Sequence, residues 1–361
     1  MNKIISPITG SDNIKNLDSH SSCISSEGII MTANVDNYIC LDSGLIFNGT
    51  GARGGEDEYY SEEYDLHSEN DESEFKYKTD DGFVGIYENI YKFISNNSNI
   101  KNFKNYLDIG CGKGLLLKKF QENHNELNLY GIEPSKQAKK MYTRIVPNAE
   151  IFSGNLEDAS LSRTSFDLIS TNGVLEHVPE PTSFLNKLYS MLNDEGYCYV
   201  GVPNFVTNPA DIYTFDHLTR FTPSSIKMLF SISGFEVKAE LIDQNRVPMW
   251  YLIQKNRNIS RITLDSKKEL DIFYKNASDM KNTLASIQKC FDNLKGKKEK
   301  IAIYGTGATF PLSTLFTDIS FDDVFCYIDD NDHLLGTLKN NIPVHLPEIL
   351  LTESIKNIII S

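Results

Sequence analysis

The stretch Tyr106-Leu107-Asp108-Ile109-Gly110-Cys111-Gly112-Lys113-Gly114, followed by the apolar Leu115-Leu116-Leu117, decides the fold of this 361-residue chain. It reads as a buried strand, a tight glycine turn and the first turn of a helix. Glycines at alternate positions let the backbone approach a ligand closely, and the free N–H groups at the start of the helix offer hydrogen-bond donors. The stretch therefore predicts an α/β fold that binds a ligand at this turn.

The glycine spacing argues against a dinucleotide as the ligand. A dinucleotide-binding turn has the pattern G-x-G-x-x-G, whereas here the pattern is G-x-G-x-G, residue 115 is Leu, and Asp108 precedes the first glycine. The next apolar strand, Asn128-Leu129-Tyr130-Gly131-Ile132, runs into Glu133 about twenty residues later, where a carboxylate can take both hydroxyls of a ribose. This pairing favours a ligand that contains ribose but is not NAD.

Three further stretches follow in order. They are Ser153-Gly154-Asn155-Leu156-Glu157-Asp158, then residues 166–178 ending in Leu175-Glu176-His177-Val178, then Leu192-Asn193-Asp194-Glu195-Gly196 before the apolar residues 197–203. The glycine stretch, the strand that ends at Glu133 and these three stretches make five motifs in a fixed order. In these motifs the chain resembles the class I S-adenosylmethionine (SAM) methyltransferases.

The resemblance implies a Rossmann-like seven-stranded sheet, SAM as cofactor and S-adenosyl-L-homocysteine as its product. The cofactor-binding residues that it implies are Asp108, Gly110, Cys111, Gly112, Glu133, Pro134, Asn155, Leu156 and Asn172.

Length and composition indicate a multi-domain protein of the cytoplasm. A chain of 361 residues suits two or three domains. No apolar run is long enough to span a bilayer, and the start lacks the apolar core of a signal peptide, so we expect no membrane partner. The six cysteines, at positions 23, 40, 111, 198, 290 and 326, form no CxxC pair, which predicts reduced thiols.

The net charge of −14 disfavours a nucleic-acid partner, because enzymes that act on nucleic acids usually present a basic face. The charge is unevenly placed. Residues 56–81 hold twelve acids and two lysines, a net charge of −10, so the rest of the chain carries −4. A nucleic-acid partner is therefore disfavoured but not excluded.

The first fifty residues predict a small β module, because two short apolar alternations, Gly28–Met31 and Tyr38–Phe47, are separated by turn-forming residues. The layout is similar to the zinc ribbon that opens the sugar C-methyltransferases. In the two ligand-bearing turns of that ribbon this chain has Ser6-Pro7-Ile8-Thr9 and Cys40-Leu41-Asp42-Ser43. Structural zinc needs four thiolate or imidazole ligands, and three of the four positions are hydroxyls, so we predict no zinc. Either the ribbon has kept its shape without its ion, or these are ordinary loop and strand residues.

Residues 48–82 are rich in glycine and then in acids and tyrosines. Composition alone favours a solvated linker. In the sugar C-methyltransferases a tyrosine-bearing segment at this place covers the active site, so the resemblance makes Tyr60, Tyr64 and His67 candidates to face the substrate, Tyr64 being a candidate catalytic residue.

Hydrophobic periodicity predicts an amphipathic helix over 83–99. The resemblance implies that the methyltransferase core follows this helix. Its strands are expected at 104–109, 128–133, 149–152, 166–171, 197–203, 235–243 and 249–255, with the last two as an antiparallel hairpin. A helix is expected over 226–233, and a longer one over 266–295.

The C-terminal part repeats the pattern of strand, glycine turn and helix in Ile301-Ala302-Ile303-Tyr304-Gly305-Thr306-Gly307, and a second strand ends in Asp329-Asp330. On motif alone this could be an NAD site, but Phe310 stands where a third small residue is required. The segment resembles the C-terminal Rossmann-like domain of the sugar C-methyltransferases, where it helps to hold a nucleotide sugar. The chain stops at the end of an expected strand, Ile358-Ile359-Ile360, as a truncated C-terminus would.

The expected organisation is therefore a degenerate zinc-ribbon-like module (1–50), a lid segment and helix (51–102), the SAM-binding core (103–256), a helical connector (257–298) and a C-terminal Rossmann-like domain (299–361). The fold class is α/β.

Two histidines follow strands of the predicted sheet at the edge where open α/β folds bind ligands, and both can titrate near neutral pH. The resemblance implies that Glu176-His177 and Asp216-His217 line the substrate pocket, with His217 as the base. Relatives carry Tyr-x-Glu-His where this chain has Tyr213-Thr214-Phe215-Asp216-His217, which leaves the role of Tyr213 open.

The predicted function is methylation of a small, sugar-like, nucleotide-linked substrate, at a carbon next to a keto group. O- or N-methylation of a saccharide or other metabolite, and SAM binding without catalysis, remain as alternatives. Sequence does not choose the acceptor, or between a monomer and a homodimer.

Overall fold

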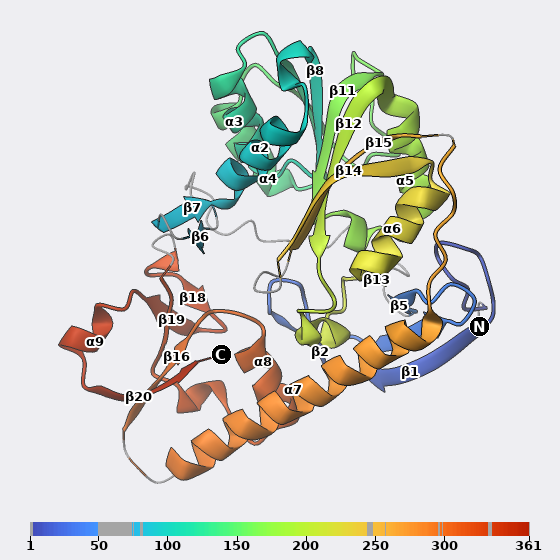
Figure 1. Cartoon of the computed structure of the whole chain (residues 1–361). Coiled ribbons are helices and arrows are strands. Elements are labelled where there is room, and N and C mark those ends of the chain that lie inside the picture. The colour runs from blue at the N-terminus through green and yellow to red at the C-terminus, as the bar shows by residue number, and fades with distance from the viewer. Residues whose placement is uncertain are drawn as a thin grey trace.

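The computed structural model describes residues 3–49, 74, 76–79, 82–243, 248–256, 258–294, 297, 299–330 and 334–360. Three larger sheets organise these residues. A seven-stranded sheet forms the centre, a four-stranded sheet gathers near the N-terminus and a five-stranded sheet lies at the C-terminal end (Figure 1). The predicted α/β class, with a small N-terminal β part and a C-terminal Rossmann-like part, is confirmed.

The central sheet has the strand order β10-β9-β8-β11-β12-β15-β14. The first five of these strands are parallel, while β15 runs antiparallel to both of its neighbours, so the predicted closing hairpin is present. The bounds of the strands are β8 (Asn105–Ile109), β9 (Asn128–Glu133), β10 (Glu150–Ser153), β11 (Phe166–Asn172), β12 (Leu192–Pro203), β14 (Phe235–Ile242) and β15 (Pro248–Lys255).

Alternate side chains of these strands enter two separate cores, because successive residues of a strand point to opposite faces. Leu107 and Ile169 lie in one core, while their neighbours Tyr106 and Leu168 lie in the other. Helices α2, α3 and α4 cover one face, and α5 and α6 cover the other (Figure 1). Their bounds are α2 (Ile86–Asn97), α3 (Leu115–Asn123), α4 (Lys136–Ile145), α5 (Pro181–Met191) and α6 (Pro223–Ile232).

The N-terminal sheet has the order β1-β4-β5-β13, and its last strand does not come from the N-terminal segment. Strand β13 (Thr219–Arg220) belongs to the loop after β12 and pairs antiparallel with β5, Thr219 opposite Phe47. The other strands here are β1 (Ile14–His20), β4 (Val35–Cys40) and β5 (Ile46–Asn48), with a separate hairpin of β2 (Cys23–Ile24) and β3 (Ile30–Met31). The loop that carries His217 is thus built into the N-terminal sheet.

The C-terminal sheet has the order β18-β19-β17-β16-β20 and is joined to the core by the long helix α7 (Ser266–Leu294) (Figure 1). Phe310, which stands where a nucleotide site would need a small residue, is fully buried against Phe291 of α7 and Tyr327 of β17. The remaining bounds are β16 (Lys300–Tyr304), α8 (Thr309–Phe316), η5 (Phe321–Asp323), β17 (Cys326–Ile328), β18 (Leu338–Lys339), β19 (Ile342–His345), α9 (Ile349–Thr352) and β20 (Ile355–Ile360).

Several element boundaries differ from the prediction. The helix expected over 83–99 begins at Ile86, because residues 82–85 pair as β7 (Gly82–Gly85) with β6 (Lys76–Thr79). Helix α6 begins three residues before the expected start, where Thr222 accepts a hydrogen bond from Ser225 N in a capping box. Strand β12 includes the segment 192–196, which was expected to be a turn.

The two turns that resemble zinc-binding turns lie together. Gly10 N donates to Ser6 O at 2.9 Å and Gly44 N donates to Cys40 O at 2.7 Å, so both turns have the same backbone hydrogen bond. The Cys40 sulfur lies 3.9 Å from the Thr9 hydroxyl. The thiol of Cys40 therefore lies beside the hydroxyls of Thr9 and Ser43.

All six cysteines are free thiols, as predicted. Among the described residues, no helix combines the length and the apolar character required to cross a bilayer.

Candidate functional site

The glycine turn after β8 has a left-handed backbone conformation and little free space at Gly110. Gly110 has a φ of +70°, and a Cβ there would lie 2.4 Å from Cγ2 of Val174. Gly110 N and Cys111 N both donate to Ile132 O, at 2.8 and 3.2 Å, which ties the turn to the end of β9. Glycine at 110 is therefore required by both its backbone angle and its surroundings.

Glu133, at the end of β9, is held by backbone donors. Its Oε2 accepts from Gly112 N at 2.7 Å and its Oε1 accepts from Ser135 N at 2.8 Å. Burial raises the pKa of this carboxyl, although the two backbone hydrogen bonds oppose the rise. The carboxylate is thus held against the glycine turn.

Asp108 takes part in a buried chain of hydrogen bonds. Its Oδ1 accepts from the Ser170 hydroxyl at 2.5 Å, and that hydroxyl also meets the Tyr106 hydroxyl at 2.7 Å. Burial, with a contribution from the charge of Glu133, raises the pKa of Asp108 to about 7. The acid before the glycines is therefore locked between β8 and β11.

The other predicted cofactor residues lie at the same edge of the sheet, because each stands at or just after the carboxyl end of a parallel strand. Gly154 N donates to Glu133 O at 3.0 Å, which brings Asn155 beside β9. Asn172 ends β11 and its Oδ1 accepts from the Tyr199 hydroxyl at 3.0 Å. Leu156 is buried, and Pro134 is half-buried. Acid, glycine turn and apolar side chain together form a donor and acceptor set that fits a nucleoside cofactor.

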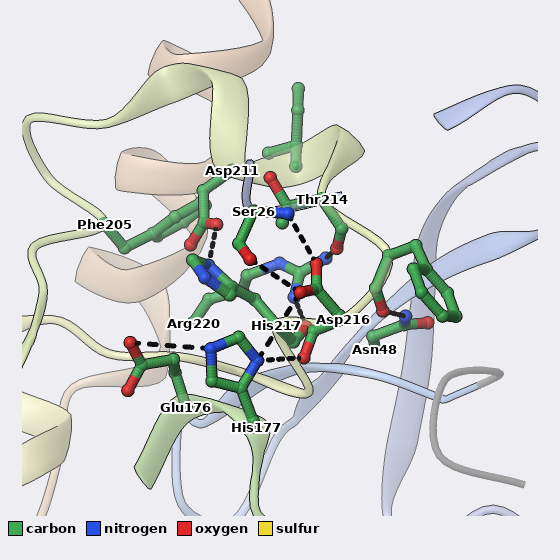
Figure 2. A network of polar contacts seen from close by, with 12 residues as sticks. Ser26, Asn48, Glu176, His177, Phe205, Asp211, Thr214, Asp216, His217 and Arg220 are labelled. Carbon is green, nitrogen blue, oxygen red and sulfur yellow. Dashed lines mark hydrogen bonds and ion pairs between the residues drawn. The ribbon is translucent and has the colours of Figure 1, made fainter. Parts of the chain in front are cut away.

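The two predicted histidines meet at this edge. His177 lies in η3 (Leu175–His177) after β11, and His217 lies in the loop after β12. Their ring centroids are 4.9 Å apart, with the rings edge to face (Figure 2). The sequence-predicted pair Glu176-His177 and Asp216-His217 is thus brought into one cluster.

The acid that orients His217 is Asp211 and not its neighbour Asp216. Nδ1 of His217 lies 2.5 Å from Oδ1 of Asp211, in η4 (Pro209–Tyr213), and both side chains are buried. Sequence reasoning passed over Asp211. The signal for it was only that an acid stands six residues before the histidine in the same loop.

Asp216 has two other contacts. Its carboxylate accepts from the backbone N and the hydroxyl of Ser26, both at 2.7 Å. Its backbone carbonyl lies 2.8 Å from Nδ1 of His177. Because a carbonyl oxygen only accepts, Nδ1 of His177 must be the donor, which fixes the tautomer of the ring.

Glu176 is buried beside both rings. Its Oε1 is 3.9 Å from Nε2 of His177, and its Oε2 has no hydrogen-bond partner among the described residues. Burial raises the pKa of this carboxyl, and the two histidines counteract that effect. A buried carboxylate oxygen without a partner is unusual and points to a missing donor at this place.

The charge balance of the cluster favours a protonated His217. Burial lowers the pKa of the ring, but Asp211, Asp216 and Glu176 outweigh burial and raise it to about 9. Burial also acts on Asp211 in the opposite sense, yet His217 and Arg220 lower its pKa overall. His217 and Asp211 therefore form a buried ion pair at neutral pH.

Arg220, which is fully buried, shapes the loop. It donates through Nη1 to His217 O and through Nη2 to Thr214 O, the latter at 3.0 Å. Sequence analysis did not single out this arginine, since nothing in the pattern marks it. Its two hydrogen bonds close the segment from Thr214 to His217 into a compact turn.

Of the two tyrosines predicted for the catalytic site, Tyr213 lies among the described residues and Tyr64 does not. Tyr213 packs at the junction of the N-terminal sheet with α8. Its ring centroid lies 4.5 Å from that of His20 and 4.8 Å from that of Phe316. Tyr60, Tyr64 and His67 lie outside the described residues.

A metal ion would also find ligand atoms here. One ligand atom from each of Glu176, His177 and His217 lies within 4.8 Å of the other two. Two imidazoles and a carboxylate are a common ligand set for divalent transition metals. The cluster thus offers two kinds of chemistry. It contains a histidine base with acids that orient it, and it also contains a set of metal ligands.

Comparison with known proteins identifies the central domain. Residues 86–240 match the family model described as a methyltransferase domain. The described fold agrees with this match, so the chain contains a class I SAM-dependent methyltransferase domain.

Among characterised relatives, the tRNA U34 carboxymethyltransferase of Sulfurimonas denitrificans is 28% identical over 178 residues, which cover 44% of this chain and 60% of that protein. The malonyl-[acyl-carrier protein] O-methyltransferase of Calditerrivibrio nitroreducens is 31% identical over 97 residues, which cover 26% of this chain and 36% of that protein. The chain thus spans less than two thirds of either relative. A solved SAM-dependent methyltransferase from Clostridium acetobutylicum aligns with a TM-score of 0.41 and 10% identity, covering 47% of this chain and 90% of that one.

Proposed function

We propose that this chain, whose residues 86–240 form a class I SAM-dependent methyltransferase domain, methylates a small, sugar-like, nucleotide-linked acceptor at a carbon next to a keto group. The observation that carries the proposal is the buried pair of His217 and Asp211 at the ligand-binding edge of the sheet. A buried, oriented imidazole is the group needed to remove a proton from carbon.

The cofactor would be held at the glycine turn. Glu133 would bind the ribose hydroxyls, Leu156 would offer apolar contact to the base, and the backbone of Gly110 and Gly112 would border the cofactor. Bound SAM supplies an electrophilic methyl group on sulfur. Methyl transfer needs little covalent help, so alignment of the acceptor by the protein accounts for most of the rate.

His217 would act as the base. Asp211 occupies Nδ1, so Nε2 is the atom that takes the α-proton, and the electron pair of the broken C–H bond is left on the acceptor carbon to form the new bond. Asp211 then stabilises the imidazolium that results. His177 and Glu176 border the same place and would contact the acceptor's polar groups.

O- or N-methylation would use the same residues, with His217 taking a proton from a hydroxyl or an amine. The acid-histidine pair does not distinguish these acceptors from carbon. The resemblance of the three-part layout to the sugar C-methyltransferases is what favours carbon. A SAM-binding protein without catalysis would not require a buried acid-histidine pair beside the cofactor turn.

An RNA acceptor, suggested by the tRNA-modifying relative, is less favoured. The net charge of −14 opposes binding to a phosphate backbone, and the second relative is named for a malonyl-[acyl-carrier protein] acceptor and not for RNA.

The experiment that tests the proposal is incubation with carbon-13 methyl-labelled SAM and a panel of nucleotide sugars, with and without a keto group, together with bulk tRNA. NMR of the products identifies the labelled atom. Label bonded to carbon, and only with keto sugars, supports the proposal. Label on oxygen or nitrogen supports the alternative reaction, and label in tRNA or in no product contradicts the proposal.

A further inference from the structure

A tight turn near the N-terminus reaches into the histidine cluster. The turn joins β2 to β3 and spans Ser25–Gly28, where Gly28 N donates to Ser25 O at 2.9 Å and Ser25 N donates to Ile29 O at 2.8 Å. Gly28 has a φ of +74°, a conformation that favours glycine. The backbone of the turn is thus fixed by its own hydrogen bonds.

The turn clamps the carboxylate of Asp216 (Figure 2). Both oxygens of Asp216 accept from Ser26, one from the backbone N and the other from the hydroxyl, across 190 residues of chain. The side chain of Asp216 is fully buried. Hydrogen bonds to a charged acceptor are stronger than neutral ones, so this two-point contact is a specific anchor.

The same hairpin holds the residues just before Asp216. Phe215 N donates to Ile24 O at 2.9 Å, and Ile24 forms an isolated parallel bridge with Thr214. Asn48, also from the N-terminal sheet, donates to Phe215 O at 3.0 Å. Consecutive residues of the loop are therefore positioned by residues 24, 26 and 48.

The contact between Ser26 and Asp216 bears on the orientation of the His177 ring. The backbone carbonyl of Asp216 accepts from Nδ1 of His177 at 2.8 Å, and the next residue is His217 itself. A displacement of Asp216 would change the acceptor of one histidine and the backbone of the other. Removing a group that orients a metal-bound imidazole through its second nitrogen commonly costs about 10–100-fold in affinity or activity, and we expect an effect of similar order here.

We propose that Ser26 is a positioning residue for the His177–His217 pair, acting through Asp216. This proposal rests on the proposed function, because it assumes that the pair works in methyl transfer. Ser26 itself is exposed at the protein surface, and both its backbone N and its hydroxyl donate to Asp216, so we expect it to act through the acid.

The matched pair Ser26→Thr and Ser26→Val tests the proposal, since the two side chains have the same shape and only Thr keeps the hydroxyl. We expect Val to lower kcat about tenfold with the affinity for SAM unchanged, and Thr to restore kcat to within about twofold of the original protein. Ser21→Ala, an exposed serine of the same N-terminal region, is the control and should leave activity unchanged.

A double-mutant cycle with Asp216→Ala identifies the route. If Ser26 acts through Asp216, adding Ser26→Val to Asp216→Ala should change kcat by less than about twofold. Fully multiplicative losses, or equal rates for the Thr and Val variants, would overturn the proposal. Should Asp216→Ala fail to fold, the Thr and Val pair still decides.

A readout without catalysis separates this proposal from the proposed function. Nitrogen-15 NMR of histidine-labelled protein reports the tautomer of each of the seven histidines, and a His177→Gln variant assigns the relevant signal. We expect the Nδ1–H form of His177 in the original protein and in Ser26→Thr, and a mixture of tautomers in Ser26→Val. An unchanged tautomer in Ser26→Val contradicts the positioning role, whatever reaction the protein performs.

Discussion

Nδ1 of His217 lies 2.5 Å from Oδ1 of Asp211, and both side chains are buried. The acid stands six residues earlier, in a 3₁₀ turn, and faces the ring because the loop folds back on itself. This pair gives the ring of His217 a defined orientation and a raised pKa.

Replacing His217 by Gln should abolish most methyl transfer while SAM still binds. Loss of a general base lowers rates by about 10²–10⁴-fold, whereas the glycine turn proposed to hold the cofactor follows a different strand, β8. Turnover of labelled SAM and calorimetric titration with SAM measure the two quantities. His345→Gln, in the C-terminal sheet, is the matched control. Transfer at more than a tenth of the original rate would show that His217 is not the base.

The rate should rise with pH up to about 9. Burial lowers the pKa of His217, but Asp211, Asp216 and Glu176 together raise it to about 9, so the ring is protonated and inactive as a base at lower pH. We expect kcat/KM to increase about tenfold per pH unit between pH 6 and 8 and to level near pH 9. A profile that levels by pH 7 would contradict this assignment.

The same pKa predicts the sign of the stability change. A raised folded-state pKa contributes stability that is fully present below the unfolded value of about 6.5 and is lost as pH rises through the folded value. The contribution of His217 should therefore decline between about pH 6.5 and 9. Urea unfolding of the original protein and of His217→Gln should differ most at the acidic end of this window.

Replacing Asp211 by Asn should lower both stability and the pH at which activity appears. Removing one partner of a buried ion pair costs about 3–5 kcal/mol at neutral pH. Without the carboxylate the pKa of His217 falls, so the rising limb of the pH profile should move to lower pH, with a lower plateau. Asp194→Asn, at an exposed site, should change neither quantity. If the rising limb of the pH profile does not move, Asp211 does not set the pKa of His217.

Glu133→Gln should weaken SAM binding by about 10–100-fold, because hydrogen bonds to a charged acceptor contribute about 1.5–3 kcal/mol each. Glu133 is held by Gly112 N and Ser135 N beside the glycine turn. Calorimetry measures the dissociation constant, and the exposed Glu126→Gln is the control. A change of less than threefold would mean that Glu133 does not contact the cofactor.

Chelation should leave activity unchanged. Ligand atoms of Glu176, His177 and His217 could surround a metal ion, but Nδ1 of each histidine is engaged and the cluster already contains the guanidinium of Arg220. Activity after dialysis against EDTA, and after adding back Mg²⁺, Mn²⁺ or Zn²⁺, tests this. Loss with EDTA and recovery with one cation would assign a metal to the cluster.

The central sheet was predictable because its signals are local. Apolar alternation in each strand reports which face is buried, and β9 has the predicted bounds of 128–133. The glycine turn and Glu133 were likewise predictable, because both are read from short stretches that end strands. The observed ends of some elements differ from the predicted ones where a local hydrogen bond was not anticipated. The capping box at Thr222 is an example.

The partner of His217 could not be predicted in the same way. The conformation of residues 211–218 depends on Ser26, Asn37 and Asn48, which are 167 to 190 residues distant in sequence. Asp216 is the acid next to His217 in the sequence. Ser26 binds its carboxylate, and Asp211 orients the ring instead. Sequence spacing carries no information about such long-range contacts.

Strand β5 cannot pair with β13 until the much later residues of β13 have been synthesised. Phe47 emerges from the ribosome long before Thr219, its partner in the sheet. At roughly 5–20 residues per second, the edge of β5 stays unpaired for on the order of 10–30 s. An unpaired edge strand is a site for wrong association between nascent chains. We expect this chain to depend on chaperones that bind early segments more than a protein whose N-terminal sheet is complete within its first fifty residues.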